Sequence, residues 1–303
     1  MSSQTLTTEK VDPVSKSRIA DFIEITKPRI SVMVLVTVAI SAAVATPQVD
    51  IWKLLFILAG VALVAASGSA VNQFIERYSD WLMPRTASRP LPAQRLTARE
   101  VSVFAAVTIG CGLSLLATMV NWQAALVALI TWILYSFVYT PLKAKTSLNT
   151  YVGAVAGALP VLIGVVGLNA GIPPIGWALF AILFIWQFPH FMAIAWKYRF
   201  EYAEGGLVMF PVSDPSGRST GWHALVFAVL HFPVGAYAIW LMAGLNPWFH
   251  VAGLALATLY LWPSIKFWQN PNKQTSRSLL LASIIYLPLM FLLVLMARML
   301  LNS

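Results

Sequence analysis

The chain has 303 residues, of which 59% are hydrophobic and only 10% are charged. A soluble domain carries about 25% charged residues and needs a polar surface, so this composition excludes a soluble protein and indicates one that crosses a membrane repeatedly. The single cysteine, Cys111, excludes an internal disulfide framework and a cysteine-based zinc site. We interpret the excess of 20 Lys and Arg over 11 Asp and Glu as positive charge in cytoplasmic loops, not as a nucleic-acid-binding surface.

Nine segments are long and apolar enough to span a bilayer, which takes about 20 residues. The first 20 residues lack the apolar region of a cleavable signal, and their acidic side chains are unlike a mitochondrial transit peptide. We therefore predict a cytoplasmic segment over residues 1–28 and one all-α transmembrane domain, a bundle of nine helices, over 29–303. The predicted spans are 29–46, 52–75, 99–119, 122–140, 150–169, 175–196, 223–243, 248–266 and 279–300.

The loops between these spans alternate between short and long, and the long ones carry the charge. With the N-terminus on one side, every Lys and Arg falls on that same side except Lys53 and Arg298. Because Lys and Arg concentrate in cytoplasmic loops, we predict a cytoplasmic N-terminus and, after nine spans, a C-terminus outside.

At the end of the second span, Asn72, Glu76 and Asp80 recur every four residues, which places them on one face of a helix. Two acids on one face repel each other, and an unpaired charge near a bilayer costs about 2.5–3.5 kcal/mol. A Mg²⁺ ion, which prefers oxygen ligands and often shares them with a phosphate, would offset both costs. The alternative is a helix end whose acids pair at the surface with Arg77, Arg85 or Arg89.

The residues that follow favour the metal site. Pro84, Pro90 and Pro92 end the helix and stiffen the turn, which holds Arg85 and Arg89 beside the acids. Arginines next to a carboxylate-bound metal suit a substrate that brings its own negative charge, such as a diphosphate.

Two further polar segments lie at helix ends on the same predicted side of the membrane. They could meet the segment at 72–92 around one opening of the helix bundle. One is YTPLKAKTSLN at 139–149, whose lysines could instead be ordinary cytoplasmic-side charges. The other is WKYRFEYAEGG at 196–206, which could be a solvated loop or a second carboxylate site. Their candidate residues are Tyr139, Lys143, Lys145, Asn149, Glu201 and Glu204.

His190 lies within the sixth span, after Pro189. A lone histidine in an apolar helix is more often a hydrogen-bonded packing residue than a ligand, but an ionisable residue inside a membrane is also a functional candidate. A histidine can bind haem iron or act as a general base. His231, in the seventh span, has the same two interpretations.

Together these segments resemble the protohaem IX farnesyltransferases, a branch of the UbiA-type membrane prenyltransferases. The matching segments are ITKPRI (25–30), N-x3-E-x3-D (72–80), RTASRPLP (85–92), YTPLK (139–143), and WQFPHF with YRFEY…G…MFPV (186–212). They occur in the family's order between about residues 22 and 212, a stretch of about two-thirds of the chain. RTxxRPLP and WQxPHF are specific to the haem branch, whereas N-x3-[DE]-x3-D indicates only the superfamily.

The resemblance implies a nine-helix bundle in the bacterial cytoplasmic (inner) membrane, open to the cytoplasm. It implies transfer of a farnesyl group from farnesyl diphosphate to a vinyl group of haem b, with water added, giving haem O and diphosphate. The product would be used as haem O or passed on to haem A synthesis or terminal oxidase assembly.

The same resemblance assigns roles to residues. Asn72, Glu76, Asp80 and Glu201 would bind Mg²⁺, and Arg85, Arg89 and Lys143 would neutralise the diphosphate. The remaining substrate-binding candidates are Tyr139, Lys145, Asn149 and, for haem, His190. The chain departs from the family pattern in having Glu76 where Asp is expected, and in the spacing of Glu201 and Glu204.

Two other functions fit the residues. A UbiA-type enzyme acting on an aromatic quinone precursor would not need His190. A haem-binding or transport protein without catalysis would explain polar residues in the membrane, although a transport path needs them near the midplane and here they gather at one face.

Overall fold

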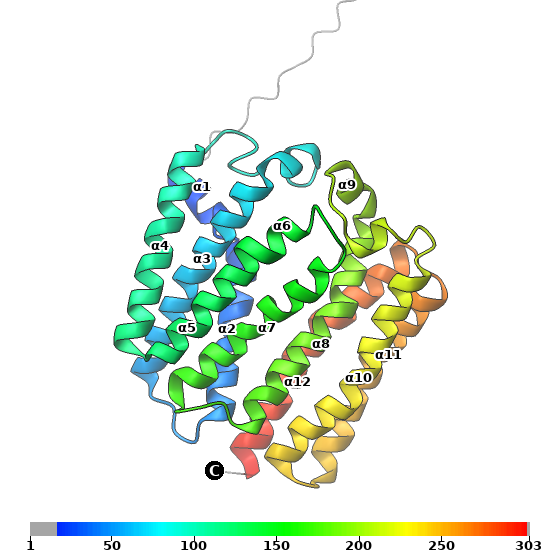
Figure 1. Cartoon of the computed structure of the whole chain (residues 1–303). Coiled ribbons are helices and arrows are strands. Elements are labelled where there is room, and N and C mark those ends of the chain that lie inside the picture. Colours follow the sequence, from blue (N-terminus) through cyan, green and yellow to red (C-terminus); the bar gives the residue numbers. More distant parts are fainter. Residues whose placement is uncertain (1–16, 302–303) are drawn as a thin grey trace, which may run out of the picture.

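The computed structural model describes residues 17–301, and all regular secondary structure within that range is helical (Figure 1). Nine of the described helices are long and apolar enough to cross a membrane. The predicted all-α fold class and number of spans are therefore confirmed. These helices are α2 (Pro28–Ala45), α3 (Ile51–Leu82), α4 (Ala98–Met119), α5 (Trp122–Ile133, extended by two short segments to Leu142), α7 (Asn149–Leu168), α8 (Pro174–Lys197), α10 (Arg218–Ala243), α11 (Pro247–Gln269) and α12 (Lys273–Leu301).

The main difference from the predicted spans is at α3, which runs to Leu82 instead of ending at residue 75. Its last two turns are polar, so hydropathy alone stops short of them. The sequence also gave no indication of two short helices, α1 (Arg18–Ile25) and α9 (Arg199–Glu204), that lie at the same end of the bundle (Figure 1). The expected absence of a signal segment rests mainly on residues 1–16, which lie outside the described residues.

Helix starts are specified by local chemistry. The carboxylate of Asp50 accepts hydrogen bonds from the backbone N–H groups of Trp52 and Lys53 at the start of α3. Thr97 and Glu100 form a reciprocal capping box at the start of α4. Three other spanning helices, α2, α8 and α11, begin with a proline, whose missing N–H has no intrahelical partner at that position.

Two apolar clusters hold the bundle together. One joins α2, α3, α4, α5 and α7, around Ile57 and Leu116. The other joins α8, α10, α11 and α12, with contributions from α2 and α7, around Leu179 and Tyr286. Because α7 contributes to both, it ties the N-terminal and C-terminal groups of helices into one domain.

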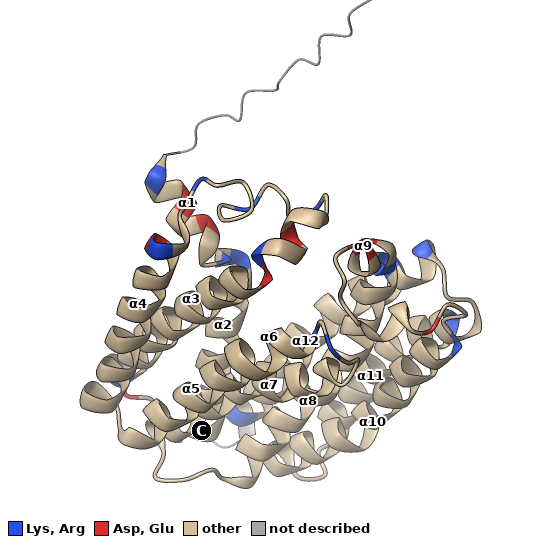
Figure 2. Ribbon diagram, turned by 45° about the horizontal axis from the view of Figure 1, so that its top comes forward, with Lys and Arg blue, Asp and Glu red and all other residues tan. Residues whose placement is uncertain are grey.

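Charged residues gather at one end of the bundle, where α1 and α9 lie (Figure 2). Among the described residues, the basic exceptions are Lys53, in the first turn of α3, and Arg298, in the last turn of α12. The one-sided distribution of charge is thus confirmed. That this charged end faces the cytoplasm stays a prediction, as does the division of the chain at residue 28.

Candidate active site

The last three turns of α3 carry Asn72, Glu76 and Asp80 to the charged end on one face of the helix, as their spacing predicts. None of them is at the surface. Asn72 and Asp80 are fully buried, and Glu76 is 8% exposed. The acids are therefore not paired at the surface, although one of the pairs that this alternative named, Asp80 with Arg89, does form. Charges buried in this way need partners, and each of the three side chains has one from a different part of the chain.

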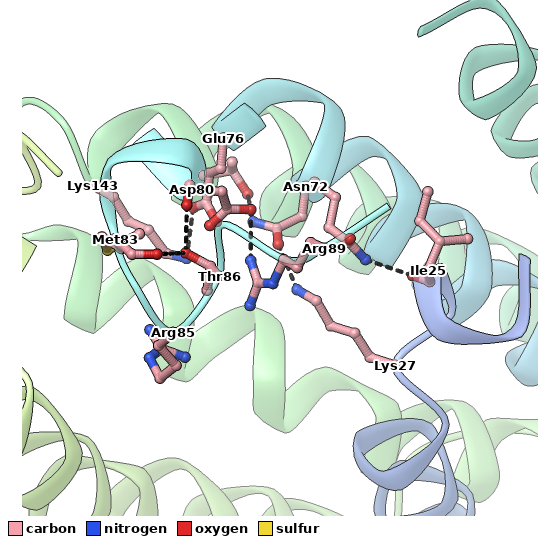
Figure 3. A network of polar contacts seen from close by, with 12 residues as sticks. Ile25, Lys27, Asn72, Glu76, Asp80, Met83, Arg85, Thr86, Arg89 and Lys143 are labelled. Carbon is pink, nitrogen blue, oxygen red and sulfur yellow. Dashed lines mark hydrogen bonds and ion pairs between the residues drawn. The ribbon is translucent and has the colours of Figure 1, made fainter. Parts of the chain in front are cut away.

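Both carboxylates are paired with cations. Lys143, just past the end of α6 (Thr140–Leu142), places its Nζ 2.7 Å from Oε1 of Glu76. Arg89, in the loop that follows α3, places an Nη1 2.6 Å from Oδ2 of Asp80. Figure 3 shows these side chains pointing toward one another. The structure thus brings the predicted residues from 72–92 and 139–143 together.

A third cation comes from a residue that the sequence analysis did not single out. Lys27, between α1 and α2, donates from Nζ to Oδ1 of Asn72 over 2.6 Å (Figure 3). Its backbone has φ 51°, in the left-handed region that side chains other than glycine rarely adopt. Backbone outliers of this kind cluster at functional sites. Lys27 stands in the matched ITKPRI segment, and this was its only signal in the sequence.

The loop carrying Arg89 is anchored at both of its ends. Near α3, Thr86 donates from Oγ1 to the backbone carbonyl of Asp80 over 2.9 Å. Near α4, Arg95 forms ion pairs with Asp21 and Glu24 of α1. These bonds fix the turn that the prolines were predicted to impose, and they hold Arg89 over the end of α3.

A π-helical segment, η1 (Leu134–Tyr139), aims the next group of side chains at α3. Its wider turn lets Thr140 bond the carbonyl of Tyr135 with both its N–H and its hydroxyl. The Thr140 Oγ1 then accepts from Nδ2 of Asn72 over 3.1 Å. The Tyr139 ring stacks on that of Tyr135, and Nζ of Lys143 lies 4.5 Å from its centroid.

Gly153 of α7 makes room for Tyr139. A Cβ at position 153 would lie 2.6–2.8 Å from two carbons of the Tyr139 ring, so Gly153→Ala forces the ring or the helix to move. Overpacking of this kind costs about 1–3 kcal/mol. We expect Gly153→Ala to lower the apparent melting temperature in detergent, measured by circular dichroism. Gly110→Ala is the matched control, because nothing lies within 4 Å of that added Cβ; equal melting temperatures of the two variants would contradict the packing argument.

Arg85 and Glu201 form a separate pair beside the cluster. Nε of Arg85 lies 3.9 Å from Oε2 of Glu201, and its guanidinium lies over the rings of Tyr198 and Tyr202. This joins α9 to the loop after α3. The place of Glu201 in the metal site stays a prediction.

Two predicted substrate-binding residues lie at the edge of the site. Asn149 is buried, and its Nδ2 donates to the carbonyls of Thr146 and Val208, which ties two loops together. Lys145 is exposed. The roles of both in substrate binding stay predictions.

His190 lies in α8 and faces α12. Its Nδ1 is 2.8 Å from Oγ of Ser283, and its ring stacks on that of Trp186. Among the described residues, no hydrogen bond or ion pair joins it to the cluster on α3. His231, in α10, is buried against Tyr260 and Tyr286. The structure thus separates the predicted haem contact from the predicted diphosphate site, on different helices.

The two lysines of the cluster lie just outside the spanning helices and differ in their electrostatics. Burial, and secondly the nearby Arg89 guanidinium, lower the pKa of Lys27 to about 7. Burial acts to lower the pKa of Lys143, but the Glu76 carboxylate, together with Tyr139 and Tyr135, outweighs burial and raises that pKa well above its usual value. Lys143 is therefore firmly cationic at neutral pH, whereas Lys27 loses its charge more easily.

The donor set fits a hard divalent cation that is completed by its substrate. Oδ1 of Asp80 is buried and has no hydrogen-bond partner, although Oδ2 of the same carboxylate is bonded to Arg89. An unpaired buried carboxylate oxygen is costly unless something binds it. Within residues 17–301, no three His, Cys, Asp or Glu side chains cluster closely enough to hold a metal by themselves. Mg²⁺, which takes one or two carboxylates plus phosphate oxygens, suits such an incomplete set.

The chain is similar in sequence to one family profile and to individual members of that family. The sequence profile of the UbiA prenyltransferase family matches residues 33–296. The protoheme IX farnesyltransferase of Rhodopirellula baltica is 39% identical over 281 residues, which are 88% of this chain and 96% of that protein.

Solved structures with the same fold have much lower sequence identity. A digeranylgeranylglyceryl phosphate synthase superposes with a TM-score of 0.78 at 18% identity, over 93% of this chain and 99% of that one. A UbiA homologue from Archaeoglobus fulgidus, bound to DMAPP and Mg²⁺, has a TM-score of 0.70 at 17% identity, over 93% of this chain and 100% of that one. At this identity the likeness shows a shared fold.

Proposed function

The chain belongs to the UbiA prenyltransferase family, in its protohaem IX farnesyltransferase branch, and on this premise we propose that it transfers a farnesyl group from farnesyl diphosphate to a vinyl group of haem b, giving haem O and diphosphate. The observation that carries the proposal is the cluster at the end of α3. There, three cations face two carboxylates and an amide, and one carboxylate oxygen has no partner. The surplus of positive charge suits an anionic substrate.

In this proposal Asp80, Glu76 and Asn72 would hold Mg²⁺, and the unpartnered Oδ1 of Asp80 would be available to bind it. The side chain of Glu76 is one methylene longer than the Asp expected there, and it is held in place by Lys143. Glu201 is the fourth proposed ligand. When bound, Mg²⁺ would stabilise the negative charge that collects on the diphosphate as it leaves. The UbiA homologue from Archaeoglobus fulgidus bound to DMAPP and Mg²⁺ supports this choice of metal.

The cations of the site neutralise the leaving group. The bond between C1 of the farnesyl chain and the diphosphate oxygen breaks, and its electron pair leaves with the diphosphate. Arg89, Lys143 and Arg85 stabilise the charge that develops there. Lys27 lies within the same cluster and adds a fourth cation, and the Tyr139 ring stands beside Lys143. The apolar bundle keeps water away from the allylic cation until the acceptor attacks.

The acceptor contributes the electrons for the new bond. The vinyl π pair of haem b attacks C1, and the cation left beside the porphyrin takes up water and releases a proton. Atoms and charge then balance as one farnesyl group and one hydroxyl added to haem b. His190 is the proposed haem contact, because it is a histidine set in an apolar helix. Both substrates are hydrophobic and could enter from the lipid.

The proposal also covers the orientation of the protein in the membrane and the use of its product. The charged end of the bundle would face the cytoplasm of a bacterial cell, because 18 of the 20 Lys and Arg lie on the side assigned to it. The product would serve as haem O or go on to haem A synthesis and terminal oxidase assembly.

The test of the proposed reaction is product identification. Purified protein in detergent is incubated with farnesyl diphosphate, Mg²⁺, and either haem b or an aromatic quinone precursor. We expect haem b to gain the mass of one farnesyl plus one hydroxyl, and the aromatic acceptor to stay unchanged. A prenylated aromatic product with unmodified haem b would contradict the proposed acceptor. Haem binding with no product from either acceptor would favour a non-catalytic protein.

Removal of the metal tests the role of Mg²⁺ separately. We expect EDTA to abolish haem O formation and excess Mg²⁺ to restore it, because Mg²⁺ that shares its coordination with the substrate diphosphate can be withdrawn by a chelator and the leaving diphosphate needs it. Product is measured by chromatography at several chelator concentrations. A rate that does not change with chelation would remove the metal from the site.

A further inference from the structure

Ser283 on α12 is fully buried, and its hydroxyl joins α12 to His190 of α8. The Oγ of Ser283 lies 2.6 Å from the carbonyl oxygen of Leu280 in its own helix, and 2.8 Å from Nδ1 of His190. Sequence analysis gave no hint of this serine, because it stands 93 residues from the histidine in an otherwise apolar helix.

The two bonds fix where the protons are. A serine hydroxyl has one proton, and a carbonyl oxygen can only accept a hydrogen bond. The hydroxyl of Ser283 must therefore donate to Leu280, since two oxygens at 2.6 Å without a proton between them would repel each other. The Oγ can then only accept from Nδ1 of His190. Nδ1 of His190 therefore carries a proton, and in the neutral ring the lone pair lies on Nε2.

The orientation of the ring is fixed as well. Trp186, one turn earlier on α8, stacks on His190 with ring centroids 4.5 Å apart and an angle of 24° between planes. The indole Nε1 of Trp186 donates to the backbone carbonyl of Ser283 over 2.8 Å. The side chains of Trp186 and His190 are therefore both hydrogen-bonded to Ser283 of α12.

The second ring nitrogen of His190 is not engaged by the protein. His190 is partly exposed, and among the described residues its Nε2 has no hydrogen-bond partner. The corresponding atom of His231 differs, because it is sealed in the protein without a partner. Of these two histidines, only His190 offers a lone pair to a molecule outside the helix packing.

We propose that Ser283 is a positioning residue for the haem acceptor: it holds His190 as the Nδ1–H tautomer, so that the Nε2 lone pair is presented to the haem iron. This rests on the proposed function, in which His190 contacts haem b. Histidines that bind metals usually donate their other N–H to a fixed acceptor, and loss of that acceptor typically costs about 10–100-fold in metal affinity or activity.

The test is the binding of ferric haem b by purified protein in detergent without farnesyl diphosphate. Optical absorption gives the dissociation constant and the signature of histidine ligation. We expect Ser283→Ala to weaken binding about tenfold or more and to change the spectrum toward that of His190→Ala. Ser283→Thr keeps a hydroxyl and should keep both values near those of the wild type.

Ser276→Ala is the matched control. Ser276 is also a buried serine of α12 whose Oγ donates to a carbonyl three residues earlier, that of Lys273, but it has no bond to a histidine. It should bind haem as the wild type does. Haem affinity and spectrum of Ser283→Ala equal to those of the wild type would overturn the proposal. So would equal losses in Ser276→Ala and Ser283→Ala, which would indicate a general packing effect.

Steady-state kinetics separate this inference from the proposed function. If the wild type forms farnesylated haem, Ser283→Ala should raise KM for haem b and leave KM for farnesyl diphosphate unchanged. If His190→Ala binds haem with the wild-type spectrum, the inference is wrong even where the transferase activity stands. If no farnesylated haem forms, the proposed function fails, and the comparison of spectra still decides the role of Ser283.

Discussion

Asp80→Asn should reduce haem O formation by about 100-fold or more while leaving the protein folded. The substitution removes the charge of Asp80 but keeps its size, and the amide oxygen can still accept from Arg89. What is lost is a negatively charged oxygen at the buried position where Oδ1 now has no partner. Without that oxygen Mg²⁺ would be held less firmly against the leaving diphosphate, and loss of one electrostatic contact to a developing charge commonly lowers kcat by about 10²–10³-fold.

The effect of Asp80→Asn is measured as kcat with saturating farnesyl diphosphate, haem b and Mg²⁺, together with the apparent melting temperature. Glu204→Gln is the control, because Glu204 is an exposed carboxylate of α9 near the same end of the bundle. It should keep both values. Normal turnover in Asp80→Asn would remove Asp80 from the site.

Lys143→Met should lose both turnover and stability. The side chains of Lys143 and Glu76 are 15% and 9% exposed, so this substitution leaves a buried carboxylate without its nearest cation. Breaking a buried ion pair from one side costs about 3–5 kcal/mol. The diphosphate also loses one of its cations, so kcat should fall even where the protein remains folded.

A double variant separates these two losses. In Glu76→Gln/Lys143→Met no buried charge is left unpaired, so the apparent melting temperature should recover most of what Lys143→Met loses. Turnover should stay low, because neither the metal ligand nor the cation is restored. Lys197→Met, which changes an exposed lysine at the end of α8, should leave turnover and melting temperature unchanged. A double variant with wild-type turnover would show that the pair serves only the fold.

The polar face of α3 could be predicted from the sequence because it depends only on spacing within one helix. The partners of that face could not be predicted in the same way. Lys27 and Lys143 reach Asn72 and Glu76 from 45 and 67 residues away, and a lysine near a helix end looks the same in sequence whether it faces water or a carboxylate. Only the packing of α1, α3 and α6 distinguishes the two.

The π-helical segment before Lys143 also could not be predicted from the sequence. Its residues, LYSFVY, read as a continuation of an apolar span, and the predicted boundary at 140 follows from hydropathy alone. The wider turn that directs Thr140 toward Asn72 is stabilised by tertiary contacts, including the close approach of Gly153 to Tyr139. Short-range propensity does not encode such contacts.

The most direct test of the metal–diphosphate site is the binding of Mn²⁺, as a paramagnetic substitute for Mg²⁺, together with a non-hydrolysable farnesyl diphosphate analogue. Electron paramagnetic resonance on purified protein in detergent reports bound Mn²⁺ and its coupling to phosphorus. We expect tight binding with phosphorus coupling in the wild type and in Glu204→Gln, and loss of both in Asp80→Asn. Mn²⁺ bound with the same affinity and coupling in Asp80→Asn would contradict the assignment of the cluster on α3 as the site of the metal and the diphosphate.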